Sequence, residues 1–290
     1  MDKSEKNKTL SKVIYLVATP IGNLADISER AVKVLSEVDF IAAEDTRNSM
    51  RLLSALGIRK ELVSYHEHNK KSSGERIIAR VLSGDSCAVI TDAGMPAISD
   101  PGEDIVRLAA ESGVTVSVIP GACAAVSALS LSALSTSRFA FEGFLPAVKG
   151  ERRRRLDAVK NEERTMIFYE APHKLKATLS DMLDVFGEGR KIALCRELTK
   201  LNEEIIRTTL RGANDLYAEK DPRGEYVIIL EGREESGETP VQSEELISLS
   251  PREQVEKYIS EGMAKKDAIK AVARERGVPK SEIYNLMIDT

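Results

Sequence analysis

The residues best suited to chemistry follow an apolar run that predicts a short buried strand. Residues 89–102 read Val-Ile-Thr-Asp-Ala-Gly-Met-Pro-Ala-Ile-Ser-Asp-Pro-Gly, and an apolar helical pattern comes next. Two aspartates, two glycines and two prolines predict a rigid, bent loop that is longer than a plain crossover turn. Ligands of open α/β sheets bind beyond the carboxyl ends of the strands, so we expect this loop to line a binding site.

Three more loops of this kind follow the ends of expected strands and lie at 19–26, 119–123 and 144–146. Such loops bring backbone amides and carbonyls close to a ligand, which suits a small polar molecule with amino, carboxyl and ribose groups. The glycine patterns of dinucleotide-binding sites and P-loops are absent from the sequence, and so is a nucleophile elbow. His66 and His68 lack a third ligand at metal spacing, so we expect no metal site.

The elements that must position these loops alternate between strand and helix. Strands are expected at 12–18, 40–43, 62–65, 87–91 and 114–119, with helices at 28–37, 48–56, 72–83, 103–112 and 122–134. This order predicts an α/β fold with a mostly parallel sheet and helices on both faces, and a buried helix at 122–134. Residues 139–146 are expected to cross into a second, more antiparallel α/β half. Its strands are expected at 165–170, 190–196, 203–209 and 225–231, and its helices at 150–162, 172–185 and 212–220.

Length, composition and charge indicate the domain organisation and the cellular compartment of the protein. The 290 residues are 42% hydrophobic with a net charge of −4, so any nucleic-acid contact must be local. We expect a disordered segment 1–11, an α/β domain 12–140, a second α/β domain 141–232, an acidic linker 233–248 and a helical module 249–290. Three widely separated cysteines and no secretory signal indicate a reducing, cytoplasmic compartment. The uncharged stretch 113–137 is broken by Pro120-Gly121, so we expect no membrane span.

The loop motifs resemble those of bacterial small-subunit ribosomal RNA 2'-O-ribose methyltransferases, which belong to the tetrapyrrole-methylase superfamily. The resemblance covers residues 12–290 and starts with Val-Ala-Thr-Pro-Ile-Gly-Asn-Leu at 17–24, Ala-Glu-Asp-Thr-Arg at 43–47 and Ser-Tyr-His-Glu-His-Asn at 64–69. It continues with the loop 91–102, Ile-Pro-Gly-Ala at 119–122, Phe-Glu-Gly-Phe-Leu-Pro at 141–146 and Tyr-Glu-Ala-Pro-His at 169–173. Arg-Glu-Leu-Thr-Lys at 196–200 and Gly-Glu-Tyr-Val at 224–227 complete it.

This resemblance implies two α/β domains with S-adenosylmethionine in the cleft between them. It further implies a homodimer and a cytidine ribose in the decoding region of 16S ribosomal RNA as substrate. The sequence departs from the superfamily's Gly-Asp-Pro loop, because Thr-Asp-Ala stands at 91–93. The cofactor-binding residues implied by the resemblance are Pro20, Ile21, Asp92, Ala93, Gly94, Met95, Ala122, Cys123, Tyr169 and Glu170.

A ribose 2'-hydroxyl is a poor nucleophile at neutral pH and must lose its proton as it attacks the methyl group. The reaction therefore needs positioning together with a base or electrostatic help. The candidate catalytic residues are Asp100, Glu197 and Lys200. Each has a structural alternative, because Asp100 is placed to cap the helix 102–112 and the charged residues at 196–200 are placed to pair with one another.

Two basic segments are candidates for contact with RNA. The run 152–155 contributes Arg152 and Arg153, although a solvated helix face explains it equally well. Residues 264–280 hold six basic and two acidic side chains in a pattern that resembles a helix-turn-helix, and a packed bundle is the alternative. The candidates in this module are Lys265, Lys266, Lys270 and Arg274. Two other functions stay open: methylation of a tetrapyrrole or diphthine-type substrate, and non-catalytic RNA binding in ribosome assembly.

Overall fold

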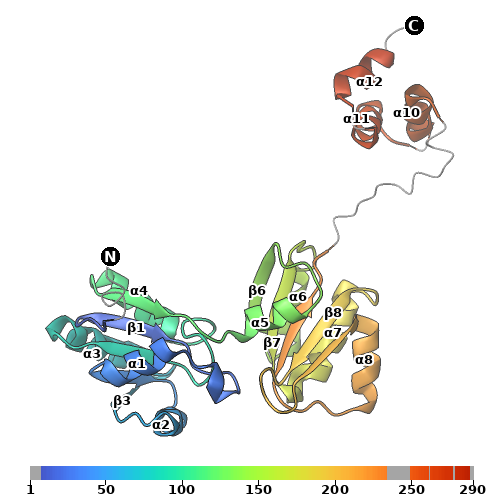
Figure 1. Ribbon diagram of the computed structural model, residues 1–290. Coiled ribbons are helices and arrows are strands. Elements are labelled where there is room, and N and C mark those ends of the chain that lie inside the picture. The colour runs from blue at the N-terminus through green and yellow to red at the C-terminus, as the bar shows by residue number, and fades with distance from the viewer. Residues whose placement is uncertain (1–7, 234–248, 261, 277, 288–290) are drawn as a thin grey trace. The chain divides into compact units, whose positions relative to one another are not determined.

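The computed structural model describes residues 8–233, 249–260, 262–276 and 278–287. The chain divides into two compact units, with the boundary after Gly232 (Figure 1). The first unit begins with β1 (Val13–Val17), η2 (Leu24–Asp26), α1 (Glu29–Glu37), β2 (Phe40–Ala43), α2 (Thr46–Ala55), β3 (Glu61–Ser64), α3 (Lys70–Ser83), β4 (Cys87–Ile90), α4 (Gly102–Glu111) and β5 (Thr115–Ile119). It continues with α5 (Ala124–Leu131), β6 (Phe139–Phe144), α6 (Lys149–Ala158), β7 (Thr165–Glu170), α7 (Pro172–Phe186), β8 (Lys191–Arg196), β9 (Glu204–Thr209), α8 (Leu210–Glu219) and β10 (Tyr226–Leu230).

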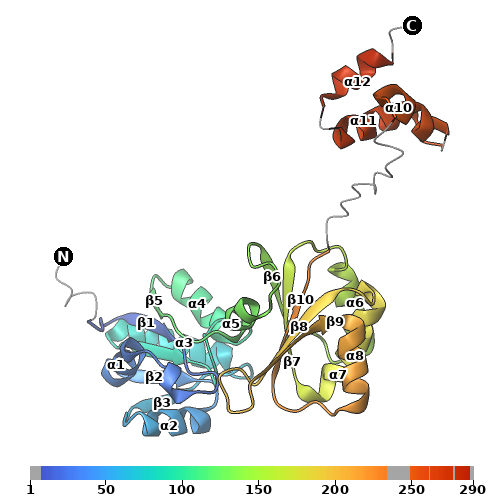
Figure 2. The same cartoon turned by 45° about the vertical axis from the view of Figure 1, so that its right-hand side comes forward.

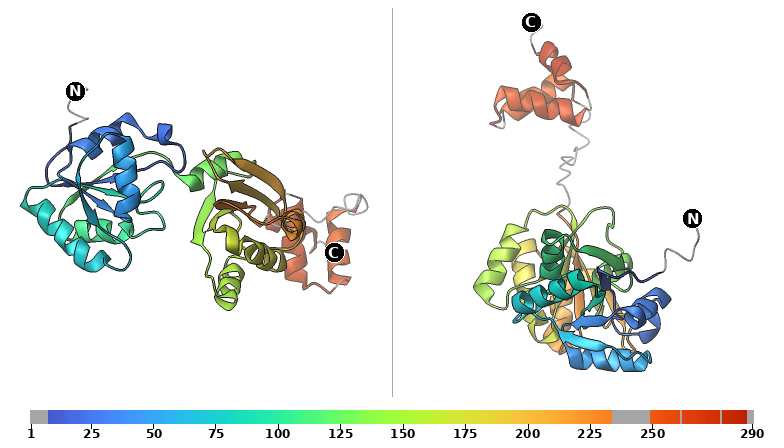
Figure 3. Two further views of the ribbon diagram at one scale, coloured as in Figure 1. Left: turned by 90° about the horizontal axis from the view of Figure 1, so that it is seen from below. Right: turned by 90° about the vertical axis from the view of Figure 1, so that its left-hand side faces the viewer.

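The first sheet has the strand order β3-β2-β4-β1-β5, and all of its neighbouring strands are parallel. Helices α1 and α2 pack on one face and α3 and α4 on the other (Figures 2 and 3). Apolar residues along these strands are buried on both faces, as parallel sheets require. Local signals place the elements well; the Ser28 hydroxyl, for example, accepts a hydrogen bond from the Ala31 amide at 3.1 Å and starts α1. The parallel α/β prediction is confirmed.

The second sheet has the strand order β6-β7-β10-β8-β9, in which only β6 and β7 run parallel. Residues 139–146 are therefore not a simple crossing, because most of them form the edge strand β6. A bulge between Phe141 and Gly143, where Gly143 has φ +66°, interrupts the alternation that would have revealed a strand. The expected domain boundary at 140/141 lies inside this strand.

Helix α5 corrects the expected domain division more strongly. Its buried residues Ala125, Ala128 and Leu129 pack with Ile167, Ala193, Cys195, Val227 and Ile229 of the second sheet. The opposite face of that sheet is covered by α6, α7 and α8. The helix is also not fully buried, because Val126 is 50% exposed. Thus a helix expected in the domain 12–140 is part of the second layered core.

The second unit contains α10 (Pro251–Ser260), α11 (Lys265–Glu275) and α12 (Lys280–Leu286), in the segment where a helical module is expected. A small core joins them, formed by Val255, Ala268, Ile269, Val272, Ala273 and Ile283. Across the described parts of both units, every helix is too short or too polar to span a bilayer.

Candidate active site

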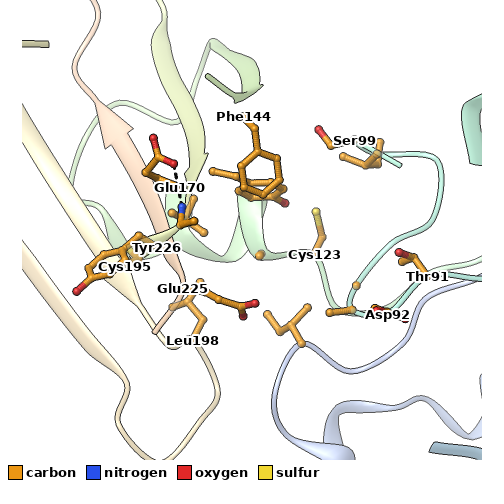
Figure 4. A pocket seen from close by; sticks show the side chains of 18 of the residues that line it. Thr91, Asp92, Ser99, Cys123, Phe144, Glu170, Cys195, Leu198, Glu225 and Tyr226 are labelled. Atoms are coloured by element: carbon orange, nitrogen blue, oxygen red, sulfur yellow. Dashed lines mark hydrogen bonds between the residues drawn. The ribbon is translucent and has the colours of Figure 1, made fainter. Parts of the chain in front are cut away.

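Strand-end loops from both sheets of the first unit surround a cavity of about 590 Å³, a size typical of small-molecule sites. Figure 4 shows side chains from the two sides pointing toward one another across it. The first sheet and its loops contribute Ile21, Glu44, Thr91, Asp92, Ala93, Gly94, Met95, Ile98, Ser99 and Asp100. The remaining lining residues are Cys123, Ala124, Phe144, Tyr169, Glu170, Ala171, Pro172, His173, Cys195, Glu197, Leu198, Lys200, Glu225, Tyr226 and Val227.

Most of the residues expected to bind the cofactor lie on this cavity. Pro20 and Ala122 are the exceptions, since they are not among its lining residues. Pro20 directly precedes Ile21, and the Ala122 carbonyl lies beside Gly94, so both are next to lining residues. All three catalytic candidates line the cavity.

Asp100 holds the central loop in shape. Its carboxylate accepts backbone hydrogen bonds from Ala97 at 2.9 Å, Ile98 at 3.3 Å and Gly102 at 2.7 Å. Ala97 and Ser99 have φ of +67° and +63°, a conformation that non-glycine residues rarely adopt. The hydrogen bonds of the Asp100 carboxylate compensate for this backbone strain. The observed contacts of Asp100 are therefore those of the structural alternative, in which it caps the helix that begins at Gly102.

Gly94 joins the central loop to the first loop. Its amide and carbonyl form a two-bond bridge with the backbone of Thr19, at 3.1 and 2.9 Å. Its φ is +86°, and a Cβ at this position would lie 3.2 Å from Cγ2 of Ile21. The backbone conformation and the neighbouring loop therefore both require glycine at this position. The amide and the carbonyl of Gly94 hold the central loop to the first loop.

Acidic groups gather where β2 and β4 end. The Thr91 hydroxyl donates to Glu44 at 2.7 Å, and the Asn48 amide donates to Asp92 at 3.1 Å. Asp92 is a predicted site residue, whereas Glu44 was missed. The signal for Glu44 was available, because it follows β2 and neighbouring parallel strands end at the same edge of a sheet.

The second sheet contributes a charged cluster at the end of β8. Lys200 Nζ lies 2.8 Å from Glu197 Oε1 and 2.8 Å from Glu225 Oε2. The hydrogen bond from Lys200 lowers the pKa of the Glu197 carboxyl. Burial disfavours the charged form of Lys200 and by itself lowers its pKa. The hydrogen bonds to Glu197 and Glu225 outweigh burial, so the pKa of Lys200 is raised. Both groups are thus held charged, which favours electrostatic roles over proton acceptance.

An aromatic wall closes one side of the cavity. Tyr169 makes edge contacts with Phe141 and Phe144, at centroid distances of 5.1 and 5.4 Å. Its phenol accepts a hydrogen bond from the Ala125 amide at 3.2 Å, and burial raises the pKa of Tyr169 to about 12. The phenol is therefore neutral at physiological pH, and its ring can contact a ligand.

Glu170 has a different environment from the one expected. Its carboxylate is buried and accepts hydrogen bonds from the Thr178 hydroxyl at 2.6 Å and the Ala171 amide at 2.9 Å. Lys174 lies 3.7 Å from the same carboxylate. These partners indicate that Glu170 fixes the start of α7, while exposed His173, which sequence reasoning missed, lies on the cavity.

Comparison with known proteins shows the family to which this chain belongs. The sequence pattern described as Tetrapyrrole (Corrin/Porphyrin) Methylases matches residues 13–214. The chain belongs to the tetrapyrrole methylase family.

Within the tetrapyrrole methylases, curated relatives define a narrower group. "Ribosomal RNA small subunit methyltransferase I" of Halalkalibacterium halodurans is 50% identical over 275 residues, covering 94% of this chain and 93% of the relative. The protein of that name from Bacillus subtilis is 47% identical over 275 residues, with the same coverage of 94% and 93%. This tetrapyrrole methylase therefore belongs to the ribosomal RNA small subunit methyltransferase I group.

Solved structures of a synthase and a methyltransferase share the fold. A diphthine synthase has a TM-score of 0.59 and 14% identity, covering 76% of this chain and 90% of that one. Uroporphyrin-III-C-methyltransferase from Thermus thermophilus has a TM-score of 0.54 and 19% identity, covering 75% and 94%. At these identities the likeness establishes the architecture of the first unit.

The first residue of the arginine run in this tetrapyrrole methylase does not offer the RNA contact expected of it. Arg152 is buried, with its guanidinium 2.7 Å from Asp181, and it also donates to the Ala147 carbonyl. Arg153 pairs with Asp184 at 2.8 Å. The prediction of RNA contact is therefore wrong for Arg152, whose charge is neutralised inside the protein, and Arg153 is already engaged by an acid.

The second unit presents its basic residues differently. Lys265, Lys266 and Lys270 are exposed on α11. Arg276 is part-buried and donates to the Gln254 side chain at 2.7 Å and to the Leu249 carbonyl, so it holds the unit together. The side chain of Arg274 lies outside the described residues. The three lysines remain candidates for RNA contact.

Proposed function

We propose that this tetrapyrrole methylase transfers a methyl group from S-adenosylmethionine to the ribose 2'-hydroxyl of a cytidine in the decoding region of 16S ribosomal RNA. The observation that carries the proposal is the 47–50% identity to proteins named ribosomal RNA small subunit methyltransferase I over almost the whole chain. The cavity with its acidic and aromatic lining supports it. Small tetrapyrroles and diphthine are less favoured substrates, because the proteins named for them share under 20% identity.

The lining of the cavity fits S-adenosylmethionine. This cofactor carries a sulfonium and an ammonium group, and carboxylates such as Glu44, Asp92 and Glu225 favour cations. The rings of Tyr169 and Phe144 add faces on which a cation is attracted. When bound, the cofactor supplies an electrophilic methyl group that leaves its sulfur as the new bond to oxygen forms.

Residues that follow β8 and residues at the start of α7 are then suited to the hydroxyl that receives the methyl group. The 2'-oxygen becomes negative as its proton leaves, and the fixed ammonium of Lys200 stabilises that charge. Glu197 orients Lys200, and its Oε1 also accepts from the Glu225 amide at 3.0 Å. His173 is a suitable proton acceptor, because histidine is the most common general base at neutral pH.

Among Asp100→Ala, Glu197→Ala and Lys200→Ala, at least one variant is expected to keep its affinity for the cofactor and lose most of its turnover. Lys200→Ala is the strongest candidate, with kcat reduced about 100-fold, the scale expected when one electrostatic stabiliser is removed. Titration calorimetry with S-adenosylmethionine and single-turnover methylation measure the two effects separately. If all three variants turn over at near wild-type rates, catalysis depends on positioning or on His173, which the same assay tests as His173→Ala.

The proposed function is tested by tritium transfer from labelled S-adenosylmethionine to isolated small ribosomal subunits, followed by mapping of the modified nucleotide. Tritium on the ribose of one cytidine of 16S RNA is the expected result. Cofactor binding without transfer to subunits or protein-free RNA would favour a small-molecule substrate. Binding of subunits without binding of the cofactor would favour a non-catalytic assembly protein.

Deletion of residues 246–290 is expected to weaken binding to the substrate subunits and to flatten its salt dependence, while affinity for S-adenosylmethionine stays the same. Each phosphate contact removed lowers the slope of log affinity against log salt by about 0.7–0.9. Reversing Lys265, Lys266 and Lys270 to glutamate in the full chain should give the same direction of change. A truncated protein with unchanged RNA affinity and salt slope would instead assign the second unit to packing.

We further propose that the protein acts as a homodimer in the cytoplasm. Val118 on the edge strand β5 and Val126 on α5 are 48% and 50% exposed, and exposed apolar side chains of this kind favour contact with a second copy. Sedimentation equilibrium of wild type, Val118→Asp and Val126→Asp tests this arrangement. A wild-type chain that sediments as a monomer at micromolar concentration would exclude it.

A further inference from the structure

Helix α2 and the turn after it form a basic surface in a protein that is acidic overall. Residues 46–60 contain Arg47, Arg51, Arg59 and Lys60 and no aspartate or glutamate, whereas the whole chain has a net charge of −4. Arg47, Arg51 and Arg59 are exposed, and the Arg47 side chain retains 85% of its accessible surface. We call Arg47, Met50, Arg51 and Arg59 the α2 patch.

The charge of the α2 patch is largely uncompensated. Arg47 shares the carboxylate of Asp45, but Arg51 and Arg59 have no carboxylate within ion-pair distance in the described part of the chain. Three of the four arginines of α6 differ, because Arg152, Arg153 and Arg155 are each paired with an aspartate or glutamate. A cation without an internal partner keeps its full attraction for an external anion.

The α2 patch begins at the rim of the cavity. The helix starts directly after Glu44, and in its first turn Asn48 donates to Asp92 at 3.1 Å. Arg51 lies three residues beyond Asn48, about 4.5 Å further along the helix axis. Figure 2 shows α2 on the outer side of the first sheet, near β3, and Arg51 on this helix is exposed.

Because the cavity is lined by carboxylates, an RNA substrate needs a basic surface outside the cavity. Glu44, Asp92, Glu197 and Glu225 all line the cavity and repel phosphates, while Lys200 is held by two of these carboxylates. An RNA strand that delivers a ribose to the cavity must therefore gain affinity outside it. Met50 is 62% exposed between Arg47 and Arg51, and it offers an apolar contact for a nucleoside.

We propose that the α2 patch binds the phosphodiester backbone of the RNA strand that enters the cavity, an inference that rests on the proposed function. Arg51 and Arg59 each contact a phosphate of this strand, and Met50, next to Arg51, packs against a ribose or base. The patch guides the target nucleotide past Asn48 and Asp92 toward the methyl donor.

The test compares Arg51→Glu/Arg59→Glu with Arg76→Glu. Arg76 is exposed on α3, on the opposite face of the first sheet, and it too has no ion pair among the described residues. Filter binding measures the dissociation constant for isolated small subunits and for protein-free 16S RNA over a range of salt. Loss of two phosphate contacts should weaken both by about tenfold or more and lower the salt slope by about 1.4–1.8. Arg51→Ala/Arg59→Ala should show a smaller loss in the same direction.

Affinity for S-adenosylmethionine and the melting temperature should be the same in all variants. Equal RNA affinity and salt slope for the double variant and Arg76→Glu would overturn the inference. Weaker subunit binding with unchanged RNA binding would place a ribosomal protein on the patch and also overturn it. Because binding is measured without turnover, failure of the proposed function is seen separately, as a wild-type protein that binds but transfers no methyl group.

Discussion

Gly94→Val is expected to weaken binding of S-adenosylmethionine by at least about 100-fold and to leave the protein folded. Valine at φ +86° costs about 1–2 kcal/mol in backbone strain. Its Cβ would also lie 3.2 Å from Cγ2 of Ile21, so the Ile21 side chain must shift by a few tenths of an ångström. The strain at Gly94 and the shift of Ile21 disturb both of the loops that the bridge to Thr19 joins, and both loops line the cavity. Titration calorimetry measures the affinity, and circular dichroism checks the fold.

Gly113→Val is the matched control for this substitution. Gly113 has φ +70°, but no atom lies within 4 Å of the position of its Cβ. The control should lose similar stability and keep its cofactor affinity. Asp92→Ala removes a carboxylate from the same loop and is expected to lose binding as well. Unchanged affinity in Gly94→Val or Asp92→Ala would exclude this loop from the cofactor site.

Asp181→Ala is expected to destabilise the protein by about 3–5 kcal/mol, because it leaves the buried guanidinium of Arg152 without its partner. Their side chains are only 4% and 6% exposed, so water cannot replace the lost carboxylate. Urea unfolding measures the change in the free energy of unfolding.

Asp184→Ala is the control for the buried pair. Asp184 pairs with Arg153 on the same two helices, but these side chains are 53% and 41% exposed. Removal of an exposed pair costs about 0–1 kcal/mol. Similar losses of stability in Asp181→Ala and Asp184→Ala would mean that the Arg152 pair is solvated in solution.

The sequence alone determined the order of the elements and the position of the main loops. Strands such as β4 and helices such as α1 follow from apolar runs, periodicity and the capping serine at Ser28. The loop at 91–102 was identified by its glycines, prolines and aspartates, whose conformational preferences act within a few residues. These signals are local, so they need no knowledge of how distant segments meet.

The tertiary structure decided which surfaces cover each other and therefore what single residues do. The uncharged sequence of α5 indicates that this helix is buried, but only the packing places Ala125, Ala128 and Leu129 on the second sheet. Arg152 has the sequence context of a solvated helix face, yet Asp181 from the next helix pairs with it inside the core. Glu225 and His173 reach the cavity only because strand ends far apart in the chain converge there. Such contacts join residues separated by tens of positions, and composition and periodicity, which describe neighbours along the chain, contain no information on them.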